Sequence, residues 1–460
     1  MKTIVEPKKS IDMLWGKQKV REGETYRLMR YVLRVEHEDK VLLHNVVTGR
    51  LAVLEQEEAE LLETLPAPYA PAMEQLVTEH YLVPQNFDEY RSVNQLRKIL
   101  QSRETGDAIN HYVILPTTFC NAHCFYCYES DYPRIHMSEE TASKLIDYID
   151  EHRQGKDVTL DWFGGEPLVG MKRIDQISQS LKERGISFTS AMISNGYLFD
   201  EAVVEKSASL WNLKRIQITL DGTEEVYNRV KAYANVKDNP FQRVLRNVDL
   251  LLDRQIYVNI RLNIDFYNKD DIHSLIESFG ERYAGNKYFA VYLNMLFNHQ
   301  GYEPVHHSED DRFALMEIID AYNERIKELN LGHERKEKIP SLAFSQCMAD
   351  NAHTVEIQPD GSFCRCEHES VLDSYGSITE GILDPKKPLV WKENIERSAD
   401  CPQCKVYPAC FLLRRCMNAD APCLERIRLK RHKVHEEYLR SVYKKYLEDE
   451  KNERVQSPCE

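Results

Sequence analysis

Three cysteines lie within eight residues of one another, Cys120, Cys124 and Cys127 in the segment "TTFCNAHCFYC". An apolar run, "HYVIL", comes directly before this segment. Thiolates bind zinc and the irons of iron–sulfur clusters. Three thiolates are one short of a closed tetrahedral site. The spacing therefore predicts either an iron–sulfur cluster with one open iron or a zinc site that His123 or a distant cysteine completes.

Short polar loops follow two further apolar runs. The segment "WFGGEP" provides Gly164, Gly165 and Glu166, and "ISNG" provides Ser194 and Asn195. Glycines let a ligand approach the backbone closely, and a carboxylate accepts hydrogen bonds from an ammonium group. A Gly-Gly-Glu sequence by itself also suits an ordinary turn.

A third loop, in "ITLDGTEEVYNRVK", provides Thr219, Asp221 and a cation, which is Lys231 or Arg229. Hydroxyl, carboxylate and ammonium groups on one loop can bind the hydroxyls and the carboxylate of a small molecule. Together with the two loops above, this loop suits a ligand that has an amino-acid end and a ribose.

Six apolar runs must position these loops, at 111–115, 158–163, 186–194, 213–220, 256–264 and 287–296. Amphipathic segments separate most of them, and two such segments, 138–153 with Ser138 as N-cap and 240–255, predict helices. Alternating strands and helices predict an α/β fold with a parallel sheet, a partial (βα)6 barrel of the TIM type. Its site would lie at the carboxyl ends of the strands, where the loops above are found.

The combination of these motifs resembles the radical S-adenosylmethionine (SAM) enzymes. The matching features are CxxxCxxC after the first strand, Tyr126 before the third cysteine, "GGEP" and "SNG". The resemblance implies a 4Fe–4S cluster on the three cysteines, whose open iron binds SAM. It also implies Tyr126 beside the adenine, Gly165 and Glu166 near the amino group, and Thr219 and Lys231 near the ribose and carboxylate. The family often has Ser and Arg at those last two positions.

Nine of the twelve cysteines follow residue 346. The first residues, "MKTIVEPKKS", lack the apolar run of a signal peptide, so we expect metal binding or redox chemistry of these cysteines and not disulfides. Their spacing resembles the SPASM extension of radical SAM enzymes, which implies two auxiliary 4Fe–4S clusters. The outer cluster would use Cys401, Cys404, Cys410 and Cys423. The inner cluster would use Cys347, Cys366 and Cys416, with Cys364 as a further candidate. A pair of zinc ribbons is the alternative.

The first hundred residues predict a small α+β module. Three short strands are expected at 31–37, 40–46 and 50–55, followed by helices within 54–65 and 70–83. Strands followed by helices fit a winged-helix module, and a simple packing subdomain fits as well. The predicted domains are therefore 1–100, a barrel at 105–330, a cysteine-rich domain at 340–430 and a charged C-terminal helix and tail at 431–460.

Composition limits the partners. The net charge of −14 argues against a nucleic-acid partner, because phosphate binding needs a basic surface. The sequence contains no uncharged run of about 18 residues, so no membrane span is expected, and we expect a soluble cytoplasmic protein.

A SPASM enzyme with an N-terminal winged-helix-like module resembles the maturases of ribosomally made peptides. That resemblance implies a precursor peptide whose leader adds as a strand to the module's sheet, and an electron donor such as flavodoxin or ferredoxin. Our first functional hypothesis is thioether formation between a peptide cysteine and a carbon. Carbon–carbon crosslinking, sulfatase maturation and a non-enzymatic metal scaffold are the alternatives.

Overall fold

The computed structural model describes residues 1–103, 108–234, 236, 238–296, 308–332, 339–343, 347–410, 413 and 423–456. The chain divides into two compact units. One comprises Met1–Thr105, Lys336–Asp350 and Leu389–Glu460, and the other comprises Gly106–Arg335 and Asn351–Pro388. We call them the outer-segment unit and the central unit.

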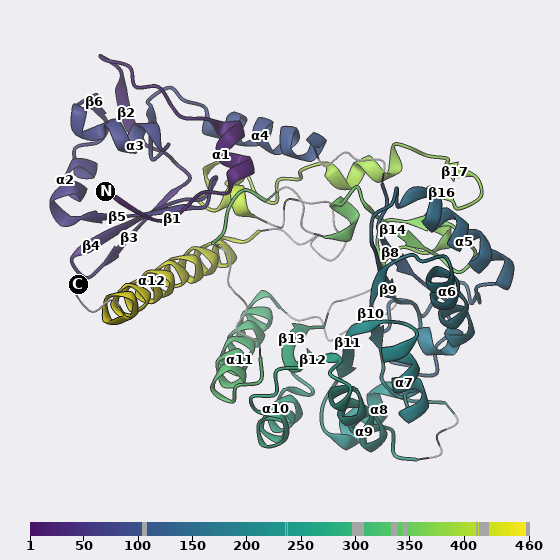
Figure 1. Ribbon diagram of the computed structural model, residues 1–460. Coiled ribbons are helices and arrows are strands. Elements are labelled where there is room, and N and C mark those ends of the chain that lie inside the picture. The colour runs from purple at the N-terminus through teal and green to yellow at the C-terminus, as the bar shows by residue number, and fades with distance from the viewer. Residues whose placement is uncertain are drawn as a thin grey trace. The chain divides into compact units, whose positions relative to one another are not determined.

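The central unit contains six parallel strands in sequential order (Figure 1). They are β8 (His111–Ile114), β9 (Val158–Trp162), β10 (Phe188–Ser194), β11 (Leu213–Leu220), β12 (Tyr257–Ile264) and β13 (Phe289–Met295). Each strand lies within one of the six predicted runs. Sequential order with helical crossovers is the arrangement of a partial TIM-type barrel, so the predicted α/β class and parallel sheet are confirmed.

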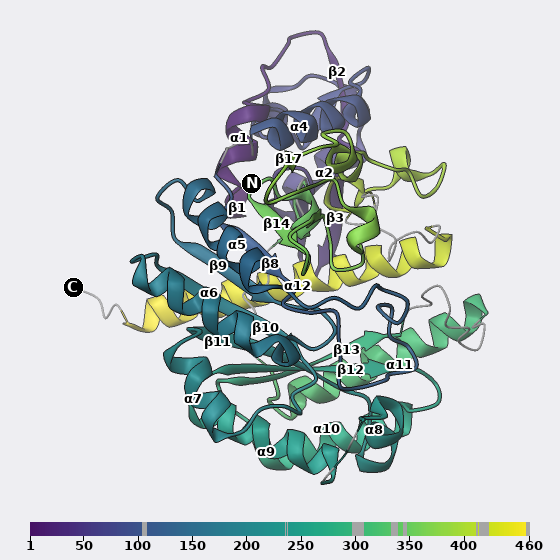
Figure 2. The same cartoon turned by 90° about the vertical axis from the view of Figure 1, so that its right-hand side faces the viewer.

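Helices connect these strands and lie along the outside of the sheet (Figure 2). They are α5 (Glu139–His152), α6 (Met171–Glu183), α7 (Glu201–Ser209), α8 (Glu224–Lys231), α9 (Pro240–Asp253) and α10 (Lys269–Tyr283). A further helix, α11 (Glu309–Glu328), follows β13. The predicted helix start at Ser138 is confirmed, since its hydroxyl accepts a hydrogen bond from the Thr141 N–H. Apolar side chains such as Ile146, Ile177 and Val248 pack with the strands in one core.

Two strands from the predicted cysteine-rich domain extend this sheet. β14 (Thr354–Ile357) pairs in parallel with β8, and β15 (Phe363–Cys364) pairs antiparallel with β14. A separate two-stranded sheet, β16 (Gly376–Ser377) and β17 (Gly381–Ile382), follows. The first part of the predicted cysteine-rich region thus continues the sheet of the central unit.

The outer-segment unit is built around a four-stranded antiparallel sheet in the order β1-β5-β4-β3. Its strands are β1 (Lys2–Val5), β3 (Val32–His37), β4 (Lys40–Asn45) and β5 (Arg50–Glu55). Three short strands, β2 (Thr25–Leu28), β6 (Ala67–Pro68) and β7 (Leu82–Pro84), form a second sheet. β3, β4 and β5 occupy the three predicted strand segments, whereas β1 had not been expected.

Helices pack on this unit's sheets. They are α1 (Lys9–Trp15), α2 (Gln56–Glu63), α3 (Glu74–Thr78), α4 (Glu89–Arg103) and α12 (Glu425–Gln456). Although α12 is rich in charge, Leu439 and Tyr443 on one of its faces are buried against Leu33 and Val35 of β3. The charged C-terminal helix is therefore also a packing element. No helix in the described parts of the chain is long and apolar enough to cross a membrane.

Candidate active site

The three-cysteine loop directly follows β8 and is tied to the end of α8. The N–H of His123 donates to the Lys231 carbonyl at 2.8 Å, and the N–H of Ala234 donates to the Asn121 carbonyl at 3.0 Å. Burial raises the pKa of Cys120 to about 12 and that of Cys127 to about 11. Burial also raises the pKa of Cys124. Such thiols become stable thiolates when positive charge, such as that of a bound metal, is close to them.

The "GGEP" loop after β9 lies against this cysteine loop. A Cβ atom at Gly165 would come within 2.6 Å of the Phe119 carbonyl oxygen, and one at Gly164, whose φ is +113°, within 2.2 Å of the Thr117 carbonyl oxygen. The N–H of Glu166 donates to the Phe119 carbonyl at 2.9 Å. Only glycines allow this approach, so the two glycines fix the distance between the two loops.

Glu166 is fully buried and links "GGEP" to the loop after β10. Its carboxylate accepts hydrogen bonds from the Ser194 hydroxyl at 2.9 Å and from the Asn195 N–H at 2.8 Å. Burial raises its pKa to about 7, although these donors act in the opposite direction. The Asn195 side chain in turn donates to Asn121 at 2.7 Å. The predicted residues of these two loops thus form one connected group beside Cys120.

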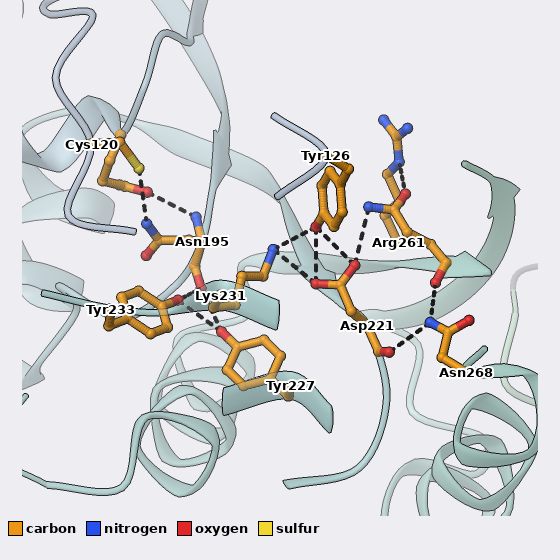
Figure 3. Close-up of polar contacts among 11 residues, drawn as sticks. Cys120, Tyr126, Asn195, Asp221, Tyr227, Lys231, Tyr233, Arg261 and Asn268 are labelled. Carbon is orange, nitrogen blue, oxygen red and sulfur yellow. Dashed lines mark hydrogen bonds and ion pairs between the residues drawn. The ribbon is translucent and has the colours of Figure 1, made fainter. Parts of the chain in front are cut away.

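Asp221, Lys231 and Tyr126 form a network in which Asp221 and Lys231 are buried and Tyr126 is half-buried (Figure 3). The Lys231 ammonium lies 3.0 Å from the Asp221 carboxylate and donates to the Tyr126 hydroxyl at 3.0 Å. That hydroxyl donates to Asp221 at 2.8 Å. Burial alone would lower the pKa of Lys231, but the adjacent Asp221 carboxylate raises it well above its ordinary value. Lys231 is therefore a charged residue whose partner is Asp221, and the pair fixes Tyr126 in the cysteine loop.

Several residues of this network were absent from the sequence predictions. Asn263 at the end of β12 donates to Asp221 at 3.2 Å, and Asn268 donates to the Asp221 carbonyl at 2.7 Å. The hydroxyls of Tyr227 and Tyr233 bond each other at 2.8 Å near the Asn195 carbonyl. Asn263 ends a parallel strand, which is the signal that could have identified it. Thr219 is half-buried on β11 and pairs in register with Arg261 of β12.

Four cysteines of the outer-segment unit line one open hollow: Cys401, Cys404, Cys410 and Cys423. Short 3-10 turns at Cys401–Gln403 and Tyr407–Ala409 place the first three of them on successive bends of the chain. Four soft thiols around one space are a suitable donor set for an iron–sulfur cluster. Among the described side chains, no group of three or more His, Cys, Asp or Glu residues converges as the ligands of a single metal ion would.

The remaining predicted ligands are distributed over the chain. Cys364 is buried on β15 and its thiol donates to the Ser370 carbonyl at 3.2 Å, while the thiol of Cys366 lies 3.4 Å from a Glu367 carboxylate oxygen. Burial raises the pKa of both. Cys347 belongs to the other unit, and Cys416 lies outside the described residues.

Residues 114–279 match the family model of the radical SAM superfamily. This range includes the three-cysteine loop and the loops after β9, β10 and β11. The chain contains a radical SAM domain. A radical SAM domain implies a 4Fe–4S cluster and SAM. The three thiols on one loop fit such a cluster, and the glycine backbone and the buried Glu166 beside them fit a ligand with an amino group.

Curated relatives share this domain at low identity. GTP 3′,8-cyclase of Clostridium perfringens (strain 13 / Type A) is 26% identical over 306 residues, which are 63% of this chain and 90% of the cyclase. The radical SAM cyclopropyl synthase TigE of Paramaledivibacter caminithermalis is 22% identical over 204 residues, 40% of each chain.

Solved structures share the fold. The structure of anSMEcpe with bound AdoMet and Cp18Cys peptide has a TM-score of 0.54 at 15% identity and covers 75% of this chain and 99% of anSMEcpe. Streptococcus suis SuiB bound to the precursor peptide SuiA has a TM-score of 0.50 at 14% identity, covering 84% of this chain and 94% of SuiB. The similarity in fold to these two proteins therefore covers more of the chain than the radical SAM domain alone.

Proposed function

We propose that this protein modifies a ribosomally made precursor peptide by forming a thioether between a cysteine sulfur and a carbon atom. The observation that carries the proposal is the second group of thiols, the four cysteines around one hollow, in a chain that also contains a radical SAM domain. Three 4Fe–4S clusters are proposed: one on Cys120, Cys124 and Cys127 and two auxiliary ones. The likeness in fold to SuiB and anSMEcpe, whose structures contain peptides, supports a peptide substrate.

The electron balance explains why auxiliary clusters suit this reaction. Joining a thiol to a C–H carbon removes two hydrogens from the peptide. When bound, the first cluster and SAM supply a 5′-deoxyadenosyl radical, which takes one hydrogen atom from carbon. The thiol loses a proton as the carbon–sulfur bond forms, and one further electron must leave the peptide. The four-cysteine hollow is the proposed site of its acceptor. A donor such as flavodoxin or ferredoxin would supply the one electron that the cleavage of SAM consumes, and the oxidised carrier would take up the electron that leaves the peptide.

The described residues have distinct proposed roles in the radical SAM domain. Glu166 holds a carboxylate where the SAM amino group would bind, and Ser194 and Asn195 fix that carboxylate through their hydrogen bonds. Asp221 and Lys231 act on SAM through Tyr126, whose hydroxyl they hold. Their pairing makes them positioning residues, whereas the sequence alone suggested direct contact with SAM.

Leader recognition would use a particular edge of the four-stranded sheet. β1 already covers the outer side of β5, so β3 provides the other edge. His37 and Lys40 flank a two-residue loop and therefore form a hydrogen-bonded pair. Residues of β3 point their backbone N–H and C=O groups alternately toward β4 and away from it, so those of Arg34 and Glu36 point away from the sheet. The Glu36 carbonyl does accept a bond from outside the sheet, from Arg440 at 3.4 Å. An extended leader would bind along β3 at Arg34.

Mass spectrometry tests the proposed reaction. The anaerobically reconstituted protein would be incubated with SAM, a reductant and the peptide encoded by the neighbouring small open reading frame. We expect the peptide to lose two hydrogens, about 2 Da, and one cysteine to resist alkylation, because its sulfur is bonded to carbon. A two-hydrogen loss with every cysteine still alkylatable would indicate a carbon–carbon crosslink and would refute the thioether. GTP, as substrate of the related cyclase, is the control for a nucleotide reaction.

A further inference from the structure

The first turns of α12 bring cationic side chains to the four-cysteine hollow. Arg428 and Arg431 of this helix line the hollow, together with Arg397. Arg431 and His432 follow Arg428 by three and four residues, and side chains with this spacing lie on the same face of a helix. The first turns of α12 therefore place positive charge beside the four cysteines.

Two of these side chains point directly at sulfur. A terminal guanidinium nitrogen of Arg431 lies 3.5 Å from the Cys410 sulfur, and the Nε2 atom of His432 lies 3.6 Å from the Cys404 sulfur. Both distances are within the range of N–H···S hydrogen bonds. The guanidinium of Arg428 forms an ion pair with Asp400 and lies 3.9 Å from Glu425. Arg431 is therefore the cation with the most direct contact to a thiol.

We infer that Arg431, assisted by His432, raises the reduction potential of the cluster held by Cys401, Cys404, Cys410 and Cys423. A cluster with four thiolates becomes more negative when it takes up an electron. Hydrogen bonds to its sulfurs and nearby cations stabilise the more negative state, so they favour reduction. This inference rests on the proposed function and assigns to Arg431 the task of making this cluster a better one-electron acceptor.

A redox titration of the reconstituted protein, followed by electron paramagnetic resonance, tests this role. The outer cluster's signal would be identified as the one that the Cys401→Ser variant lacks. In Arg431→Gln we expect the ratio of reduced to oxidised outer cluster, at a fixed ambient potential, to fall about tenfold. For a one-electron couple that change equals a potential about 59 mV lower. Arg431→Lys keeps the positive charge, so the reduction potential of its outer cluster should remain close to that of the unsubstituted protein.

Lys433→Gln is the matched control, because it removes one positive charge from the same helix at an exposed position that pairs with Glu437 at 3.9 Å. It should leave the potential of the outer cluster unchanged. An equal potential in Arg431→Gln and the unsubstituted protein, with full iron content, would overturn the inference. Loss of about four irons in Arg431→Gln would also overturn it, since Arg431 would then hold the cluster rather than tune it. Zinc in place of iron and sulfide would instead refute the proposed function.

Discussion

Replacing Lys231 by Met should destabilise the central unit strongly, because it leaves the Asp221 carboxylate charged and fully buried without its cation. Breaking a buried ion pair by removing one partner typically costs about 3–5 kcal/mol. The hydrogen bonds that Tyr126 and Asn263 donate to Asp221 offset part of this cost, so we expect about 3 kcal/mol. The double variant Asp221→Asn/Lys231→Met, which removes both charges, should recover much of the loss.

Hydrogen exchange of the β11 amides, followed by mass spectrometry, measures this change within the central unit. A cost of about 3 kcal/mol corresponds to roughly 150-fold faster exchange of amides that open with the unit. Lys206→Met is the matched control, since Lys206 forms a 2.9 Å ion pair with Asp175 whose side chains are 38% and 31% exposed. Such a pair should cost less than about 1 kcal/mol. Equal exchange in the two single variants would refute the view that the Asp221–Lys231 pair organises this site.

Two further predictions follow from the edge strand and the buried carboxyl. Arg34→Pro should abolish binding of the precursor peptide, measured by fluorescence anisotropy, because proline removes the outward N–H of an edge strand. Arg34→Ala keeps this N–H and should still bind the peptide. Equal binding by both variants would contradict docking along β3. Since the pKa of Glu166 is raised to about 7, the folded state keeps a proton that the unfolded state releases near pH 4.5. Stability without SAM should therefore fall by about 3 kcal/mol between pH 4.5 and 7, and urea unfolding of Glu166→Gln should lack this fall.

The strands of the radical SAM domain could be predicted because they are long apolar runs between well-marked helices. β11 occupies its predicted segment in full, and Ser138 begins a helix as its side chain suggests. The loops after β8, β9 and β10 come together because parallel strands bring their carboxyl ends to one edge. The motifs at the strand ends were therefore enough to predict that Glu166 and Asn195 lie close to the cysteine loop.

Other features depend on partners distant in sequence. β14 and β15 are only four and two residues long. β14 is a strand because it pairs with β8, and β15 because it pairs with β14. β1 is similar, because four residues near the amino terminus pair with β5. Lys231 and Asp221 are ten positions apart, and each could have bound a ligand. That they bind each other depends on the left-handed turn at Ala232 and on the position of Tyr126, which the spacing of the residues does not reveal.

The formation of 5′-deoxyadenosine tests the central claim most directly. The reconstituted protein, SAM and dithionite would be incubated anaerobically, and the nucleoside would be quantified by liquid chromatography. We expect 5′-deoxyadenosine from the unsubstituted protein and none from Cys124→Ala. Cys459 is outside all the proposed ligand sets, so Cys459→Ala should also form the nucleoside. Equal amounts from Cys124→Ala and the unsubstituted protein would contradict the assignment of the three-cysteine loop as the site where SAM is cleaved.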